Sequence, residues 1–176
     1  MNDPSEIESL TEVAPISQFE LEELWSQLEA EQNLTRGIIG GVIGLVIGTA
    51  LWTLITVLSN YQNNWMAVGV GLLVGSGVRD LGKGFEGIFG IVGGSLAGLG
   101  CLLGNLIATL IIVARALEIP FVDLLIILDL GIVIDLMSFS FSFLDLVFYG
   151  FAIYTGYHIS FRRITEEDLA QRITSS

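Results

Sequence analysis

Long uncharged apolar runs alternate with short polar segments along most of this chain. Residues 37–59 form the first run, 23 residues without a charged side chain, or about 34 Å as a helix at ~1.5 Å per residue. A bilayer has a hydrocarbon core about 30 Å thick, so this run predicts a transmembrane helix. We expect three further spans at residues 62–79, 88–114 and 144–161. The pattern therefore predicts an all-α fold, a polytopic helical membrane protein with about four transmembrane helices.

The second of these spans has a competing interpretation. Its uncharged apolar part, residues 65–78, is 14 residues or about 21 Å long. Crossing the bilayer requires residues 61–64 to extend the helix and the Arg79 side chain to reach the far surface. A re-entrant helix is the alternative.

Residues 115–143 are also apolar, but three aspartates interrupt them at intervals of six residues. On an α-helix, positions six apart point about 120° away from each other, so these carboxylates cannot share one face. A span exposed to lipid would place a carboxylate in hydrocarbon at about 2.5–3.5 kcal/mol. We therefore expect this segment to lie in the interface or to re-enter the membrane partway. The three residues are Asp123, Asp129 and Asp135.

Basic residues are distributed unevenly about the four predicted spans. One side carries Arg36, Arg79, Lys83, Arg162, Arg163 and Arg172, and the other carries Arg115. Cytoplasmic loops carry the excess of Lys and Arg, so four crossings place both termini in the cytoplasm. A fifth crossing would move three of these arginines to the other side and weaken the asymmetry.

Glycine adds a second pattern to the apolar runs. Residues 37–104 hold 18 of the 21 glycines, many at four-residue spacing. Four residues are close to one helical turn, so each series forms a groove along one helix face, and such grooves let transmembrane helices approach closely. This glycine-zipper pattern predicts a tightly packed bundle. The expected helix-packing positions are Gly40, Gly44, Gly48, Gly71, Gly75, Gly90, Gly94 and Gly98.

Composition supports the membrane class, with 52% hydrophobic and 15% charged residues. Most of the net charge of −12 comes from residues 1–36, an acidic tail with nine acidic residues and one basic residue. An amphipathic helix is expected at about residues 18–32. Its apolar side, a docking surface for a partner, holds Leu21, Leu24, Trp25 and Leu28.

The polar face of this helix is acidic, which disfavours binding to anionic lipid. It can dock on the protein's own loops near Arg79 and Lys83 or on a basic partner. Residues 37–163 form the predicted transmembrane bundle, and residues 164–176 form a short cytoplasmic tail.

Three segments resemble an uncharacterised family of small bacterial four-span integral membrane proteins. They run over residues 68–79, Val-Gly-Val-Gly-Leu-Leu-Val-Gly-Ser-Gly-Val-Arg, residues 99–105, Leu-Gly-Cys-Leu-Leu-Gly-Asn, and residues 145–162, which end in Gly-Tyr-His-Ile-Ser-Phe-Arg. The resemblance covers roughly residues 37–163. It implies an architecture and a bacterial inner (plasma) membrane location, and no activity.

Three polar residues in or beside the predicted spans are candidates for a polar or ion site. Asn105 fits an interhelical hydrogen bond or a station on a permeation path. Asp145 fits a helix N-cap or, with Tyr149 one turn later, a cation or proton site. The sequence leaves these alternatives open.

Catalytic motifs are missing from the sequence. One histidine and one cysteine, without a metal-binding or phosphate-binding motif, leave little from which to build a catalytic centre. The acidic balance opposes nucleic-acid binding. We therefore expect that the protein is not an enzyme and that it has no cofactor and no metal site.

The leading hypothesis is a non-enzymatic membrane protein that acts as a packing or accessory subunit. In the lipid bilayer, its glycine-faced helices would pack against a second copy of the chain, as a homo-oligomer, or against another membrane protein. The acidic helix would bind a partner. The alternative is a small oligomeric channel or transporter for ions or small solutes.

Overall fold

The computed structural model describes residues 18–59, 61 and 64–164. Within these residues it contains seven helices and no strand, which confirms the all-α prediction. The chain forms two compact units, Gln32–Arg163 and a smaller unit of Met1–Glu31 with Ile164–Ser176.

The smaller unit contains one described helix, α2 (Gln18–Glu31), which covers nearly the same residues as the predicted helix at 18–32. Leu24 and Leu28, one turn apart, are buried, whereas Trp25 is 50% exposed. The side chain of Leu21 lies outside the described residues.

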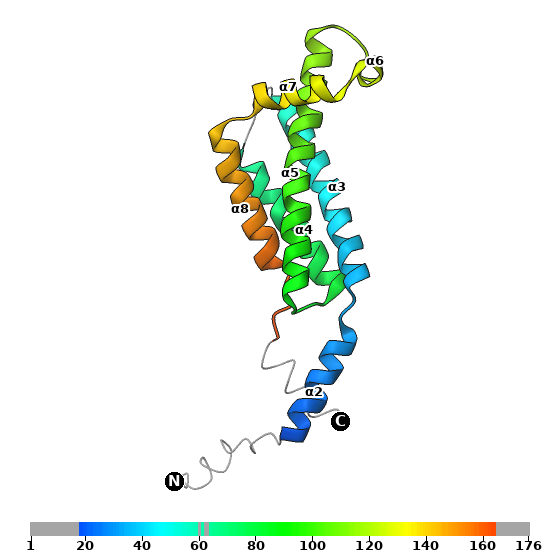
Figure 1. Ribbon diagram of the computed structural model, residues 1–176, viewed down its shortest axis with the longest axis vertical. Coiled ribbons are helices and arrows are strands. Elements are labelled where there is room, and N and C mark those ends of the chain that lie inside the picture. The colour runs from blue at the N-terminus through cyan, green and yellow to red at the C-terminus, as the bar shows by residue number, and fades with distance from the viewer. Residues whose placement is uncertain (1–17, 60, 62–63, 165–176) are drawn as a thin grey trace, which may run out of the picture. The chain divides into compact units, whose positions relative to one another are not determined.

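Four helices of the larger unit lie side by side (Figure 1). They are α3 (Leu34–Ser59), α4 (Met66–Gly82), α5 (Gly87–Ala116) and α8 (Phe143–Ile159). Among the described residues, α3 and α5 are long and apolar enough to cross a membrane, which supports membrane association. The pair α7 and α8 passes the same test as a span bent by 100°, which makes two or three candidate spans.

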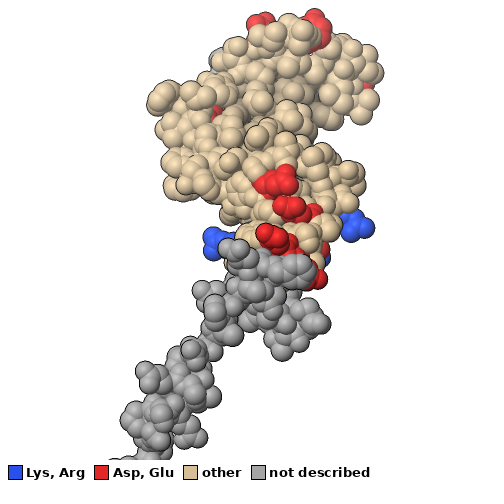
Figure 2. All heavy atoms as spheres, turned by 60° about the horizontal axis from the view of Figure 1, so that its bottom comes forward, with Lys and Arg blue, Asp and Glu red and all other residues tan. Residues whose placement is uncertain are grey.

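The outer surface of the bundle is apolar. Leu58 on α3 is 75% exposed, and Ile91 on α5 is 58% exposed. On the face drawn in Figure 2, uncharged side chains cover most of the surface of the bundle. Large apolar side chains over a wide surface are typical of contact with lipid rather than water.

The interior of the bundle is built from small and β-branched side chains around one tryptophan. Val70, Val74 and Val78 recur at four-residue intervals on α4 and are almost fully buried. Ala97 and Cys101 do the same on α5. Small side chains allow close packing where helices have no hydrophobic driving force between them.

Two short helices, α6 (Phe121–Ile127) and α7 (Leu130–Ser140), lie at one end of the bundle (Figure 1). Buried Leu124 of α6 packs with Leu110 and Ala114 of α5. The Asp129 carboxylate caps α7 by accepting a hydrogen bond from the Ile132 amide at 2.8 Å. With 7 and 11 residues, neither helix is long enough to span a bilayer alone.

The opposite end of the bundle is fixed by backbone geometry. Lys83 adopts a positive φ of 50° and ends α4. The Asn33 amide donates a hydrogen bond to the Gly82 carbonyl at 2.9 Å. The Phe85 amide donates to the Gln32 side-chain oxygen at 3.1 Å. These bonds hold the connection between α4 and α5 against the start of α3.

Candidate functional site

Glycines of α3 and α4 face one another across a close backbone contact. A methyl group on Gly40 would overlap the Gly77 carbonyl oxygen, and one on Gly77 would overlap the Gly40 carbonyl oxygen. A methyl group on Gly44 would lie 2.5 Å from the Leu73 carbonyl oxygen, and one on Gly48 would lie 3.3 Å from the Val70 side chain. Three of the glycines expected at helix contacts therefore face α4.

The glycines of α4 at the other two predicted positions face α8. A methyl group on Gly71 would lie 2.5 Å from the Ala152 carbonyl oxygen, and one on Gly75 would lie 2.9 Å from the Ile159 Cβ. These five glycines therefore meet neighbouring helices of the same chain.

The glycine series of α5 has a different environment. Gly90 packs under the rings of Tyr157 and Phe161, 2.7 and 2.6 Å from where its Cβ would lie. The Cβ position of Gly94 lies 3.2 Å from the Ile153 carbonyl oxygen and 3.6 Å from the Tyr157 Cβ, and that of Gly98 lies 3.2 Å from the Ile153 side chain. These two glycines help to line an open groove of ≈ 420 Å³ between α5 and α8. Gly90 and Gly94 are buried beside this groove, whereas Gly98 is partly exposed.

A larger apolar groove of ≈ 650 Å³ lies between α3 and α5. Its polar lining comes from Thr49, Thr53 and Arg115. The Thr49 hydroxyl donates to the Gly100 carbonyl at 3.2 Å, and an Arg115 guanidinium nitrogen donates to the Val57 carbonyl at 3.3 Å. These bonds tie the two helices together along the groove.

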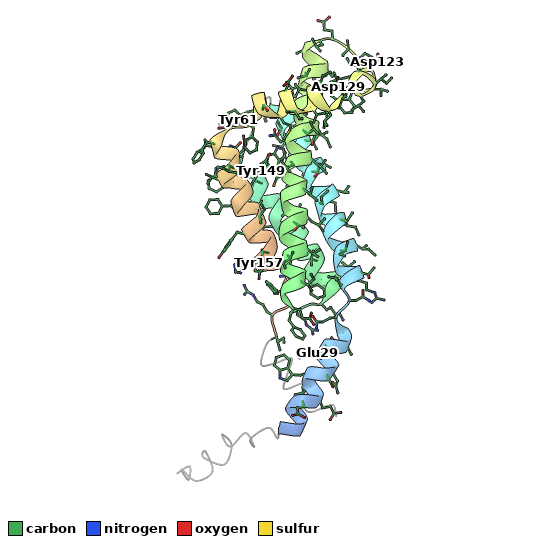
Figure 3. The ribbon with its side chains drawn as sticks, in the orientation of Figure 1. Glu29, Tyr61, Asp123, Asp129, Tyr149 and Tyr157 are labelled. Carbon is green, nitrogen blue, oxygen red and sulfur yellow. The ribbon has the colours of Figure 1, made fainter. Side chains whose placement is uncertain are left out.

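The structure brings together the three polar residues singled out from the sequence. Asn105 and Asp145 are each 1% exposed, and Tyr149 is 6% exposed. The Tyr149 hydroxyl donates to the Cys101 carbonyl at 3.3 Å, from the position on α8 labelled in Figure 3. Asn105 interacts with the Tyr149 side chain, and the Asp145 carboxylate lies close enough to act on it electrostatically.

Asp145 has a local structural role as well. Ser142, not Asp145, is the N-cap of α8, so the prediction that Asp145 is the N-cap is wrong. Asp145 occupies the third helical position and closes a capping box, in which its Oδ2 accepts a hydrogen bond from the Ser142 amide at 2.7 Å. Its Oδ1 is buried and accepts no hydrogen bond from the described residues.

Two further buried residues with polar atoms come from α3 and were missed by sequence reasoning. Trp52 is fully buried, with its ring edge-on to Tyr149 at a centroid distance of 6.2 Å. Thr56, one turn later, is 2% exposed. The indole nitrogen of Trp52 and the hydroxyl of Thr56 are buried without hydrogen-bond partners among the described residues. The available signal was spacing, because both residues continue the Gly44-Gly48 series at four-residue intervals.

The acidic residues of the 115–143 segment do not converge. Asp123 and Asp129 lie at the α6 and α7 end of the bundle, opposite the end where Tyr157 lies (Figure 3). No group of three or more His, Cys, Asp or Glu side chains in the described part of the chain is placed to hold a metal ion.

No protein-family model, curated protein or solved structure matches this chain. The resemblance to a family of small bacterial membrane proteins therefore stays a prediction.

Proposed function

We propose that this chain is a non-enzymatic integral membrane protein that acts as a packing or accessory subunit and self-associates through the groove between α5 and α8. One observation carries the proposal: Gly94 and Gly98 line this open groove and their Cβ positions lie 3.2 Å or more from α8, whereas methyl groups added at Gly40, Gly44, Gly71 and Gly75 would lie 2.9 Å or less from a neighbouring helix.

The chemistry of the groove favours a second copy of the same chain. Gly90, Gly94 and Gly98 repeat at four-residue spacing, the pattern with which transmembrane helices pair by close backbone approach. All residues that line the groove are uncharged, so the groove offers no charge to select a different partner. Two copies related by a two-fold axis would place the same glycine face on each side of one interface.

We further propose that α4 and α8 cross the membrane beside α3 and α5, with both termini in the cytoplasm of a bacterium. Each of these two helices has 17 residues, or about 26 Å at ~1.5 Å per residue, the lower limit for a span. The support is their position alongside α3 and α5 and the basic residues that follow each helix, Lys83 after α4 and Arg162 after α8.

The acidic helix α2 remains the proposed docking element for a partner. Glu22, Glu23 and Glu29 are exposed on it, so its outer surface is suited to a partner with a basic surface.

Ser95→Phe is expected to convert the assembled protein to monomer. Ser95 is exposed and lines the α5–α8 groove, so a phenyl ring there fills the groove without entering the bundle. Leu72→Phe on α4, where Leu72 is 44% exposed, is the matched control. Native mass spectrometry of the gently extracted protein measures the result. A native protein that is monomeric, or a Ser95→Phe oligomer of unchanged mass, contradicts the proposal.

The second candidate function is a small channel or transporter, and the buried cluster around Asp145 favours it. A carboxylate inside a membrane bundle with one oxygen unbonded by the described residues is a typical feature of ion and proton paths. Tyr149, on which Asp145 acts electrostatically, also meets Asn105 of α5 and Trp52 of α3, which add polar atoms from two other helices.

Asp145→Asn is expected to reduce flux of protons or monovalent cations into liposomes at least tenfold if this second function holds. Asparagine keeps an oxygen that can accept the hydrogen bond from the Ser142 amide, so the capping of α8 is retained while the charge is lost. Asp129→Asn, which alters the cap of α7 outside the cluster, is the control. Flux that is absent from the native protein, or equal in Asp145→Asn, excludes this function.

A further inference from the structure

A basic cleft lies at the end of the bundle where α4 and α8 finish. It has a volume of ≈ 350 Å³ and is lined by Arg79, Asp80, Lys83, Arg162 and Arg163. The first two residues belong to the last turn of α4, and the last two follow α8. The Arg162 amide donates a hydrogen bond to the Gly84 carbonyl at 2.8 Å, so backbone contact holds the two chain segments together around the cleft.

The lining of the cleft is strongly unbalanced in charge. Four cationic side chains and one carboxylate line it, which gives a net charge of +3 at neutral pH (4 − 1). Asp80 is paired with Arg79, with Nε and Oδ1 2.9 Å apart. Lys83 and Arg163 add further positive charge to the lining, and this excess of positive over negative charge favours a bound anion.

We propose that this cleft binds the phosphate headgroup of an anionic phospholipid. Basic pockets between membrane helices bind such headgroups through Lys and Arg. The position favours a lipid over a soluble phosphate, because the cleft lies where the apolar helices end. Leu81 is 43% exposed beside it, and Ile88 is 41% exposed at the start of α5. A phosphate in the cleft would leave the acyl chains along apolar helix surface.

The proposed lipid site is independent of the proposed self-association. The cleft shares none of its lining residues with the α5–α8 groove. A basic side chain can anchor a helix at a membrane surface without a cleft. Arg36, at the start of α3, is a basic residue of this kind, because it does not line the cleft. Arg36 therefore provides a charge-matched control at the same end of the bundle.

The test is a lipid titration of the full chain after delipidation in detergent, followed by native mass spectrometry. The probes are cardiolipin, phosphatidylglycerol and phosphatidylcholine with identical acyl chains, and inorganic phosphate alone. We expect the two anionic lipids to bind at least tenfold more tightly than phosphatidylcholine. Each of Lys83→Gln and Arg163→Gln is expected to weaken anionic binding about fivefold, as expected for loss of one basic side chain at a lipid surface. Arg36→Gln is expected to change it less than twofold.

Three results would overturn the proposal. Equal affinity for the three lipids excludes recognition of an anionic headgroup. An equal loss in Arg36→Gln shows that total charge, not the cleft, controls binding. Inorganic phosphate bound by native protein and lost in Arg163→Gln, without a lipid preference, assigns the cleft to a soluble phosphate. Arg163 is exposed and lies beyond the end of α8, so its variant tests the site even where Lys83→Gln disturbs the end of α4.

Discussion

Gly77→Ala is expected to destabilise the folded bundle by about 1–3 kcal/mol or more, the usual range for overpacking a closely packed interior. The added methyl group would overlap the Gly40 carbonyl oxygen. Backbone cannot rotate away as a side chain does, so α3 and α4 must move apart along their contact. Reversible unfolding in mixed detergent micelles, followed by circular dichroism, measures the loss.

The matched control for this substitution is Gly69→Ala on the same helix. No atom lies within 4 Å of the methyl group that this change adds. Replacing glycine by alanine inside a helix stabilises it by roughly 0.5–1 kcal/mol, so the two variants should shift stability in opposite directions. Equal effects of the two substitutions would show that α3 and α4 are not in backbone contact.

Trp52→Ala is expected to lower the free energy of unfolding by about 3–5 kcal/mol, the range for removing a large buried aromatic side chain. Trp52 is fully buried and packs against Gly104 and the ring of Tyr149. Its removal leaves a cavity among three helices, and the same unfolding assay measures the loss.

Leu54→Ala is the control for the tryptophan variant, since Leu54 lies on the same helix and is 53% exposed. Its removal leaves no internal cavity and should change stability by less than about 1 kcal/mol. Trp52→Phe keeps an aromatic ring but removes the indole nitrogen, so it separates the contribution of that nitrogen to stability from the contribution of ring packing. A small effect of Trp52→Ala would contradict the placement of this ring in the interior.

The helices themselves were predictable from the pattern of apolar and polar residues. The predicted segment 88–114 corresponds to α5, Gly87–Ala116, and segment 144–161 to α8, Phe143–Ile159. A helix that is apolar on all sides can form only within an uncharged run that polar residues end. The limits of such a run can be read from neighbouring residues in the sequence. Whether α4 and α8 cross a membrane depends on the lipid boundary, which helix length alone does not determine.

Helix partners were not predictable, because spacing shows which residues share a face but not what that face meets. Gly71 and Gly75 of α4 face α8, whereas Gly77, two residues further on, faces Gly40 of α3. Those two faces lie on different sides of α4. Packing against the neighbouring helices determines how α4 is rotated about its axis, and therefore which helix each face meets. The sequence therefore identified glycine faces, and only the fold shows that most of them are covered by the same chain.

The candidate site was predictable where charge or polarity is conspicuous in an apolar run. Asn105, Asp145 and Tyr149 stand out in this way, and the structure brings them together. Trp52 and Thr56 do not stand out, because a tryptophan and a threonine are ordinary in a transmembrane segment. Their role depends on the rotation of α3, which again is a property of the assembled bundle.

The contact between Gly40 and Gly77 also limits how this protein can change over generations. Each residue meets the carbonyl group of the other, so no side chain on the opposite helix can be trimmed to make room for a substitution. Gly84 is different, because a side chain added there would meet the Phe89 ring and not backbone. A smaller residue at position 89 would relieve that clash. Second-site suppressors should therefore be recoverable for a variant at Gly84, whereas reversion is the simple route back at Gly40 or Gly77.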